Sequence, residues 1–126
     1  MRKLVFGLAA LAFASGMAAI ATTILAFARP GDCIVHSRPL YGGTETLIDR
    51  TLDAYGIDAV GFDDGVSEAS IRAALTTAKS RGRVCVIMIE TPSNPLNTVV
   101  DIALLRRLAD EICAGQDVRP VIVCDN

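Results

Sequence analysis

The chain has 126 residues, of which 52% are hydrophobic and 21% charged, and its formal net charge is -2. This length suffices for one domain with a hydrophobic core, and the composition is that of a globular protein rather than a disordered one. A nucleic-acid-binding surface, or one for anionic membranes, needs a basic excess that this chain lacks. We therefore expect neither nucleic acid nor a membrane as a partner.

The cysteines and the single histidine do not have the spacing of metal ligands. Cys33, Cys85, Cys113 and Cys124 form no C-x-x-C pair, and His36 has no partner at zinc-ligand spacing. We therefore predict no metal site. Cys33, Cys85 and Cys124 lie inside apolar runs, which indicates small buried side chains in a reducing cytoplasm.

The N-terminal region carries two competing signals. A charged start at residues 1–3 precedes an apolar run with a small-x-small ending at residues 12–14, the pattern of a signal peptide. However, the apolar stretch continues to Ala28, and Ser15-Gly16 interrupts it where a strand would pass into a helix. We favour the strand and helix in a cytoplasmic protein, and an exported or membrane-anchored small protein is the alternative.

From residue 9 onward, short apolar runs typical of strands alternate with helical periodicity. The expected strands are residues 11–14, 33–36, 57–62, 83–89 and 120–124, and the expected helices are residues 17–27, 44–55, a segment capped by Ser67, and residues 101–113. Tyr55 and Ile102 are expected on the apolar faces of their helices. The alternation predicts an α/β fold with a mostly parallel sheet and helices on both faces.

In such a sheet, ligands bind outside the carboxyl ends of the strands. Polar, turn-rich segments follow the expected strands at residues 15–17, 38–43, 63–64, 90–95 and 125–126. Because the carboxyl ends of parallel strands meet at one edge, these segments form a single candidate site.

Two of these segments suit a phosphorylated, planar ligand. Gly16 and Met17 lie between an expected strand and helix, where free N–H groups and the helix dipole favour an anion. Tyr41 precedes two glycines in a loop and can lay its ring flat on a planar ligand. An ordinary tight turn and a partly buried loop tyrosine are the structural alternatives.

The other two segments place an amide and two carboxylates at the same edge. After Glu90, two prolines fix an extended loop in which Asn94 projects its amide toward a ligand oxygen. Asp125 ends a buried strand, where a carboxylate costs solvation energy unless a cation or hydrogen-bond donors meet it. A protonated pyridine nitrogen would be such a partner. The alternatives are a rigid connector for the loop and a helix cap for Asp125.

Four segments together resemble the cystathionine gamma-synthase family of pyridoxal-phosphate (PLP) enzymes of Cys/Met metabolism. They are AFASGMAAIATTILAFARPGD, SRPLYGGT, IMIETPSNPLNTVVDIALLRRLAD and VIVCDN, and the match covers about residues 9–126. The resemblance implies part of the large domain of a fold-type I PLP-dependent transferase, with pyridoxal 5'-phosphate as cofactor. It also implies a lyase or transferase of transsulfuration that acts on a sulfur-containing amino acid or a homoserine ester, as a homotetramer at full length.

The resemblance assigns a role to each candidate residue at the phosphate and the ring face. The backbone N–H groups of Gly16 and Met17 would hold the cofactor phosphate. Tyr41 would stack on the pyridine ring and act as the catalytic residue by assisting proton transfer.

It also assigns roles at the ring's polar atoms. Asn94 would hydrogen-bond near the ring oxygen, with Glu90 bracing that loop. Asp125 would pair with the pyridinium nitrogen and keep it protonated, so that the ring can act as an electron sink.

The chain departs from the family in what surrounds these residues. Its lysines, Lys3 and Lys79, do not match the lysine that forms the family's Schiff base. The resemblance therefore implies that residues 1–126 are a partial cofactor-binding domain, without the N-terminal segment, the Schiff-base lysine region and the C-terminal domain, and inactive alone. A non-catalytic α/β module that binds a phosphorylated small molecule is the other alternative.

Overall fold

The computed structural model describes residues 10–126. In chain order, the elements are α1 (Gly16–Phe27), β1 (Asp32–Ser37), α2 (Gly42–Thr46), the π-helix η1 (Leu47–Leu52), β2 (Asp58–Phe62), α3 (Glu68–Arg81), β3 (Arg83–Glu90), α4 (Ile102–Ile112) and β4 (Val121–Asp125). The beginning of the signal-like run, residues 1–9, lies outside the described residues. Within residues 10–126, no helix is long and apolar enough to cross a membrane.

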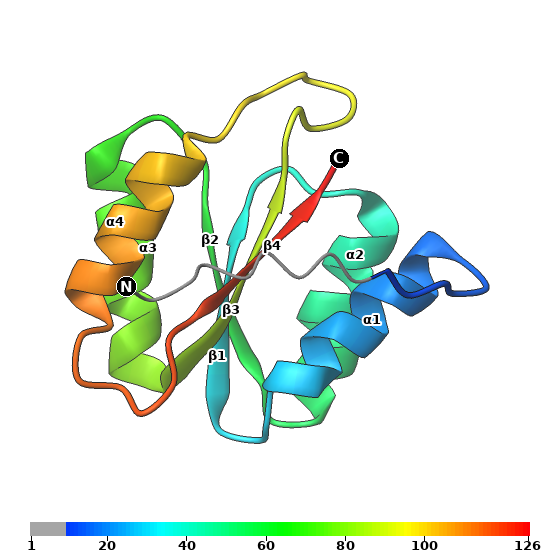
Figure 1. Cartoon of the computed structure of the whole chain (residues 1–126), viewed down its shortest axis with the longest axis horizontal. Helices are drawn as coiled ribbons and strands as arrows, with labels where there is room; N and C mark the ends of the chain where they lie inside the picture. The colour runs from blue at the N-terminus through cyan, green and yellow to red at the C-terminus, as the bar shows by residue number, and fades with distance from the viewer. Residues whose placement is uncertain (1–9) are drawn as a thin grey trace, which may run out of the picture.

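The four strands form one parallel sheet in the order β2-β1-β3-β4. Helices α1 and α2 cover one face, and α3 and α4 cover the other (Figure 1). This confirms the predicted α/β fold with a parallel sheet and helices on both faces. All four strands point the same way, so their carboxyl ends lie together at the top of the view in Figure 1.

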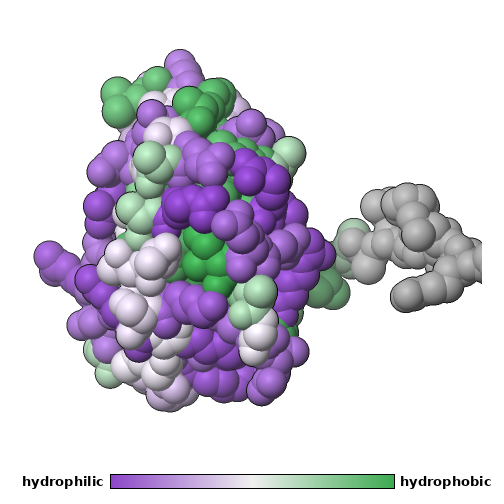
Figure 2. Space-filling view, turned by 90° about the vertical axis from the view of Figure 1, so that its left-hand side faces the viewer, coloured by the Kyte–Doolittle hydropathy of each residue, from purple (hydrophilic) through white to green (hydrophobic). Residues whose placement is uncertain are grey.

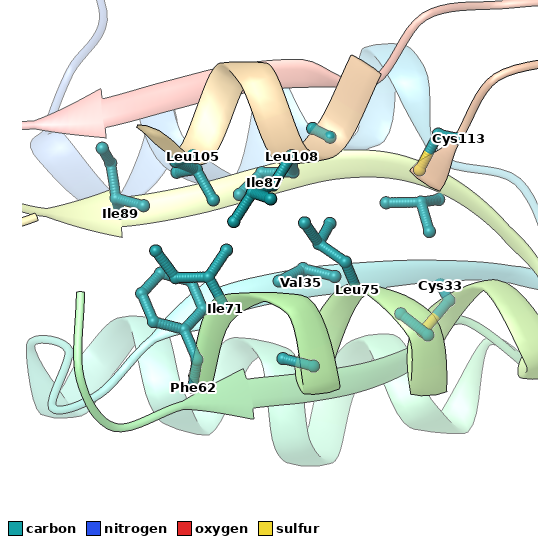
Figure 3. Close-up of a cluster of buried hydrophobic side chains, with 14 residues drawn as sticks. Cys33, Val35, Phe62, Ile71, Leu75, Ile87, Ile89, Leu105, Leu108 and Cys113 are labelled. Atoms are coloured by element: carbon teal, nitrogen blue, oxygen red, sulfur yellow. The ribbon is translucent and has the colours of Figure 1, made fainter. Parts of the chain in front are cut away.

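The core has two layers because the side chains of the central strand β3 point to both faces of the sheet. Ile87 and Ile89 pack with Leu105 and Leu108 of α4 and with side chains of α3 (Figure 3). On the other face, Met88 packs in the cluster that contains Ile24 of α1 and residues of η1. This two-sided burial is expected of a central parallel strand, which reads as a continuous apolar run.

Polar side chains fix the start of each long helix. The Ser15 Oγ accepts a hydrogen bond from the Ala18 N–H, and the Asp101 Oδ1 accepts one from the Leu104 N–H. Ser67 caps α3 in the same way, as predicted. The outer face of α3 and α4 is mostly hydrophilic (Figure 2), and ion pairs of Arg72 with acidic side chains of both helices lie on it.

Residues 11–14 form no strand, so the prediction of a short buried strand there is wrong. No strand of the described sheet lies beside them, and Leu11 is 84% exposed. An apolar run becomes a strand only where a neighbouring strand completes its backbone hydrogen bonds. The described part of the chain provides no such neighbour, so four of the five predicted strands are observed.

Two predicted core residues are exposed. Ile102 is the first residue of α4 and is 44% exposed, because Val100 and Leu104 pack against the core in its place. Tyr55 is also exposed. The expected helix over residues 44–55 is split into α2 and the wider turns of η1, which rotate the side chains away from the 3.6-residue period used for the prediction.

The cysteines differ in burial, which predicts their reactivity. Burial raises the pKa of the Cys33 thiol to about 12 and that of Cys85 to about 11, and Cys113 is also buried. Cys124 is exposed, so the expectation that it is buried is wrong: it lies on β4, an edge strand of the described sheet.

We expect iodoacetamide to modify Cys124 alone in the native chain, because the thiolate is the reactive form and the other thiols are buried. Mass spectrometry of peptides after native and denatured labelling measures this. Modification of Cys33 or Cys85 in the native chain at the rate of Cys124 would contradict the packing described.

His36 is buried in β1, and its Nδ1 lies 3.0 Å from the carbonyl oxygen of Ser37. Burial lowers its pKa from the ordinary value of 6.5. In acid the unfolded chain therefore binds a proton that the folded chain excludes, and we expect stability to fall as the pH drops below about 6.5. Urea unfolding at several pH values should show that His36→Val loses less unfolding free energy toward acid pH than the native chain does. An equal loss in both proteins would contradict the burial of His36.

Candidate functional site

A cavity of about 240 Å³ lies between α1, β3 and β4 near the carboxyl edge of the sheet. Its lining comes from α1 and from these two strands: Gly16, Ala19, Ile20, Thr23, Met88, Val123, Cys124 and Asp125. Two residues predicted from separate segments, Gly16 and Asp125, therefore line the same cavity. They lie 109 positions apart in a chain of 126 residues, and the parallel sheet is what brings them together.

The first turn of α1 presents unused backbone donors. Ser15 caps the helix through the Ala18 N–H, and the Ala19 N–H bonds to the Ser15 carbonyl oxygen. Among the described residues, no group accepts a hydrogen bond from the N–H of Gly16 or Met17. These donors and the positive end of the helix dipole favour an anion at this position.

Tyr41 stands immediately before α2 and lies against the first turn of α1. Its ring is next to Gly43: a Cβ atom at Gly43 would lie 2.7 Å from the Tyr41 Cε1 and 3.0 Å from the Met17 Sδ. The Thr44 hydroxyl, which is buried, lies 3.9 Å from the same sulfur. Tyr41 is 56% exposed, so much of the ring remains accessible to a ligand.

Glu90 connects the two loops that carry Tyr41 and Asn94. Its Oε2 accepts a hydrogen bond of 2.6 Å from the Tyr41 N–H, and its Oε1 accepts one of 2.9 Å from the Asn94 N–H. The N–H of Glu90 itself donates to the Ser37 Oγ at 3.1 Å. A single buried carboxylate at the end of β3 thus fixes the backbone of both loops relative to the sheet.

Asp125 lies beside Glu90 in the parallel register of β3 and β4. The Thr91 N–H donates to the Asp125 carbonyl oxygen at 3.3 Å, which fixes the end of β4. Within residues 10–126, no basic side chain forms an ion pair with Asp125. Its carboxylate is therefore available to a cationic group in the cavity.

The model of one protein family, described as Cys/Met metabolism PLP-dependent enzyme, matches residues 1–126. The chain belongs to this family. It is 39% identical over 100 residues to the cystathionine gamma-synthase of Escherichia coli, a match that covers 79% of this chain and 24% of that protein.

Solved structures agree with the family model. The metB protein of Corynebacterium glutamicum superimposes with a TM-score of 0.74 at 32% identity, over 90% of this chain and 26% of its own. The O-acetylhomoserine (thiol)-lyase metY of Campylobacter jejuni superimposes with a TM-score of 0.72 at 33% identity, over 90% of this chain and 25% of its own. That structure holds a pyridoxyl-lysine monophosphate. The chain spans about a quarter of the length of the curated relatives it matches.

The donor set at the carboxyl edge fits the cofactor of the Cys/Met metabolism PLP-dependent enzymes. Unused N–H groups of Gly16 and Met17 suit its phosphate, the exposed ring of Tyr41 suits its planar face, and the unpaired carboxylate of Asp125 suits its protonated ring nitrogen. Asn94 is exposed on the loop that Glu90 holds. The structure thus places all six predicted residues at one edge of the sheet.

Three residues of this site were missed by the sequence prediction. Ser37 holds the backbone of Glu90, Thr44 contacts Met17, and Thr23 lines the cavity two helical turns beyond Gly16. The spacing of Gly16, Ala19 and Thr23 along one face of α1 is a signal that could have indicated an open, ligand-facing side. Ser37 and Thr44 carry no such signal, because their roles depend on contacts between distant segments.

Proposed function

We propose that residues 10–126 form the central part of the cofactor-binding domain of a PLP-dependent enzyme of sulfur amino-acid metabolism. The observation that supports this proposal is that Gly16 and Asp125 line one cavity, with unused N–H groups at the start of α1 and a carboxylate at the end of β4. Bound pyridoxal phosphate supplies an electron sink for reactions at the α-carbon of an amino acid.

Each residue has a defined task in this proposal. The N–H groups of Gly16 and Met17 would bind the phosphate. Tyr41 would cover the ring, and its hydroxyl would assist proton transfer. Asn94 meets the ring oxygen from the loop that Glu90 holds in place. Asp125 keeps the ring nitrogen protonated, because a carboxylate within hydrogen-bond reach favours the charged form of a base.

The reaction class follows from the names of the relatives. They include cystathionine gamma-synthase, cystathionine gamma-lyase and O-succinylhomoserine sulfhydrylase. These names support elimination or replacement on a sulfur-containing amino acid or a homoserine ester as the activity of the full-length protein. A cytoplasmic homotetramer at full length belongs to the same proposal.

The 126-residue chain by itself is proposed to bind the cofactor without turnover. Its lysines are Lys3 and Lys79. Lys79 lies near the end of α3, on the opposite face of the sheet from α1, and its Nζ donates to the Ile112 carbonyl oxygen. It therefore cannot reach the cavity that Gly16 and Asp125 line.

Titration with pyridoxal phosphate, followed by absorbance, tests the proposal. We expect Asp125→Asn to weaken binding by at least about tenfold, because a charge-assisted hydrogen bond to the ring nitrogen is lost. Asp117→Asn is the matched control, since Asp117 is exposed in the loop that precedes β4. Equal affinities of the native chain and Asp125→Asn, or equal losses in both variants, would refute the assignment of Asp125.

A further inference from the structure

Gly42 and Gly43 begin α2, and neither is required by the backbone there. Among the described residues, the glycines with a positive φ are Gly31, Gly56 and Gly115, so any L-residue can adopt the conformation of Gly42 and Gly43. In a helix, glycine is even less favourable than alanine, by about 1 kcal/mol. The backbone therefore explains neither glycine, and the space around each one is the remaining structural reason to test.

The space around Gly42 differs from the space around Gly43. A Cβ atom at Gly42 would meet nothing within 4 Å. A Cβ atom at Gly43 would lie 2.7 Å and 3.2 Å from two ring atoms of Tyr41, and 3.0 Å from the Met17 Sδ. Real Cβ atoms essentially never approach another heavy atom within 3.0 Å, so a side chain at position 43 must displace the ring.

We infer that Gly43 is a positioning residue that sets the place of the Tyr41 ring beside the phosphate-binding turn of α1. The absent side chain leaves a gap over the Gly43 Cα, and the ring occupies this gap with Met17 at its side. Because Glu90 already fixes the Tyr41 backbone through the N–H, the remaining freedom of the residue is in its side chain. Gly43 leaves the ring room at this one place without touching the ligand.

Only the expected effect on cofactor affinity rests on the proposed function, because the ring of Tyr41 lies against Gly43 without any cofactor. Tyr41 and Tyr55 are the two tyrosines of the chain, and there is no tryptophan. In a Tyr55→Phe background, tyrosine fluorescence therefore reports on Tyr41 alone. Its quenching by acrylamide measures how far the ring is exposed.

We expect Gly43→Ala to raise the quenching constant of Tyr41, and Gly42→Ala to leave it unchanged. Both variants add one methyl group to the same turn of α2, so they differ only in what the methyl group meets. Equal quenching in the two variants would overturn the inference. Should Gly43→Ala fail to fold, the Tyr41→Ala, Gly43→Ala double variant must regain a cooperative melt, and its failure to do so would also overturn it.

Cofactor affinity gives the second readout. We expect Gly43→Ala to lower the affinity for pyridoxal phosphate by about tenfold, as loss of an aromatic stacking contact does. In a Tyr41→Ala background, the same substitution should cost nothing further, because it acts through the ring. Full additivity of the two losses would contradict a positioning role. Absence of any cofactor binding would refute the proposed function while the fluorescence comparison still decides the role of Gly43.

Discussion

Ile87→Ala is expected to lower the free energy of unfolding by about 2–5 kcal/mol, the usual cost of removing a large buried aliphatic side chain. Ile87 lies in the central strand β3 and is fully buried between α3 and α4 (Figure 3). The loss combines the transfer free energy of the removed methyl and methylene groups with the cavity that they leave. Because a domain of this size is stable by about 5–15 kcal/mol, urea unfolding will show a large shift of the midpoint.

Ile102→Ala is the matched control for this substitution. The same atoms are removed, but Ile102 is partly exposed at the start of α4, where alanine is the better helix former. We expect a change within about 0.5 kcal/mol, as for other surface substitutions. A loss at Ile102 equal to that at Ile87 would mean that the first turn of α4 packs more closely than the structure shows.

Glu90→Ala is expected to destabilise the chain by about 3 kcal/mol, because two backbone N–H groups lose a charged acceptor. The donors are those of Tyr41 and Asn94, which lie in the two loops at the carboxyl edge. Both loops should loosen together, since one carboxylate holds both. Hydrogen exchange of these two amides should accelerate more than that of the amides in β1.

The control is Glu111→Gln on the outer face of α4. The carboxylate of Glu111 is about half exposed and pairs with Arg72, and such surface ion pairs contribute about 0–1 kcal/mol. If Glu90→Ala cost no more than Glu111→Gln, the two hydrogen bonds of Glu90 would not hold the loops. Faster exchange at Asn94 without faster exchange at Tyr41 would likewise exclude a joint role.

The sequence predicted the elements whose formation depends on local signals. The four strands β1 to β4 are short apolar runs bounded by turn residues, and Ser67 is a helix cap that needs only the next three residues. The parallel direction of the strands then follows from strand–helix alternation. The same reasoning placed the candidate site, because carboxyl ends of parallel strands converge whatever the details of packing.

The predictions that failed depend on partners outside the local segment. Residues 11–14 have the composition of a strand but no neighbouring strand within the described residues. Ile102 fits the apolar period of its helix, yet Val100 and Leu104 occupy the core in its place. Cys124 lies in an apolar run, and its exposure follows from the position of β4 at the sheet edge. Sequence periodicity carries no information about these neighbours.

The contacts within the candidate site also could not be predicted from the sequence. The sequence did single out the loop containing Asn94 and the glycines after Tyr41. However, the hydrogen bonds from Glu90 to both loops and the contact of the Tyr41 ring with Gly43 join residues of different elements. Only the folded arrangement shows which of these residues have free hydrogen-bonding groups and which hold the others in place.

The first turn of α1, Tyr41 and Asp125 are proposed to surround one ligand. Amide chemical-shift mapping of the ¹⁵N-labelled chain, titrated separately with pyridoxal phosphate, pyridoxal and inorganic phosphate, tests it most directly. We predict that pyridoxal phosphate and phosphate both shift the amides of Gly16 and Met17, and that pyridoxal phosphate and pyridoxal both shift those of Tyr41 and Asp125. Shifts centred on Lys79 at the end of α3, with none at Gly16 and Met17, would contradict the account.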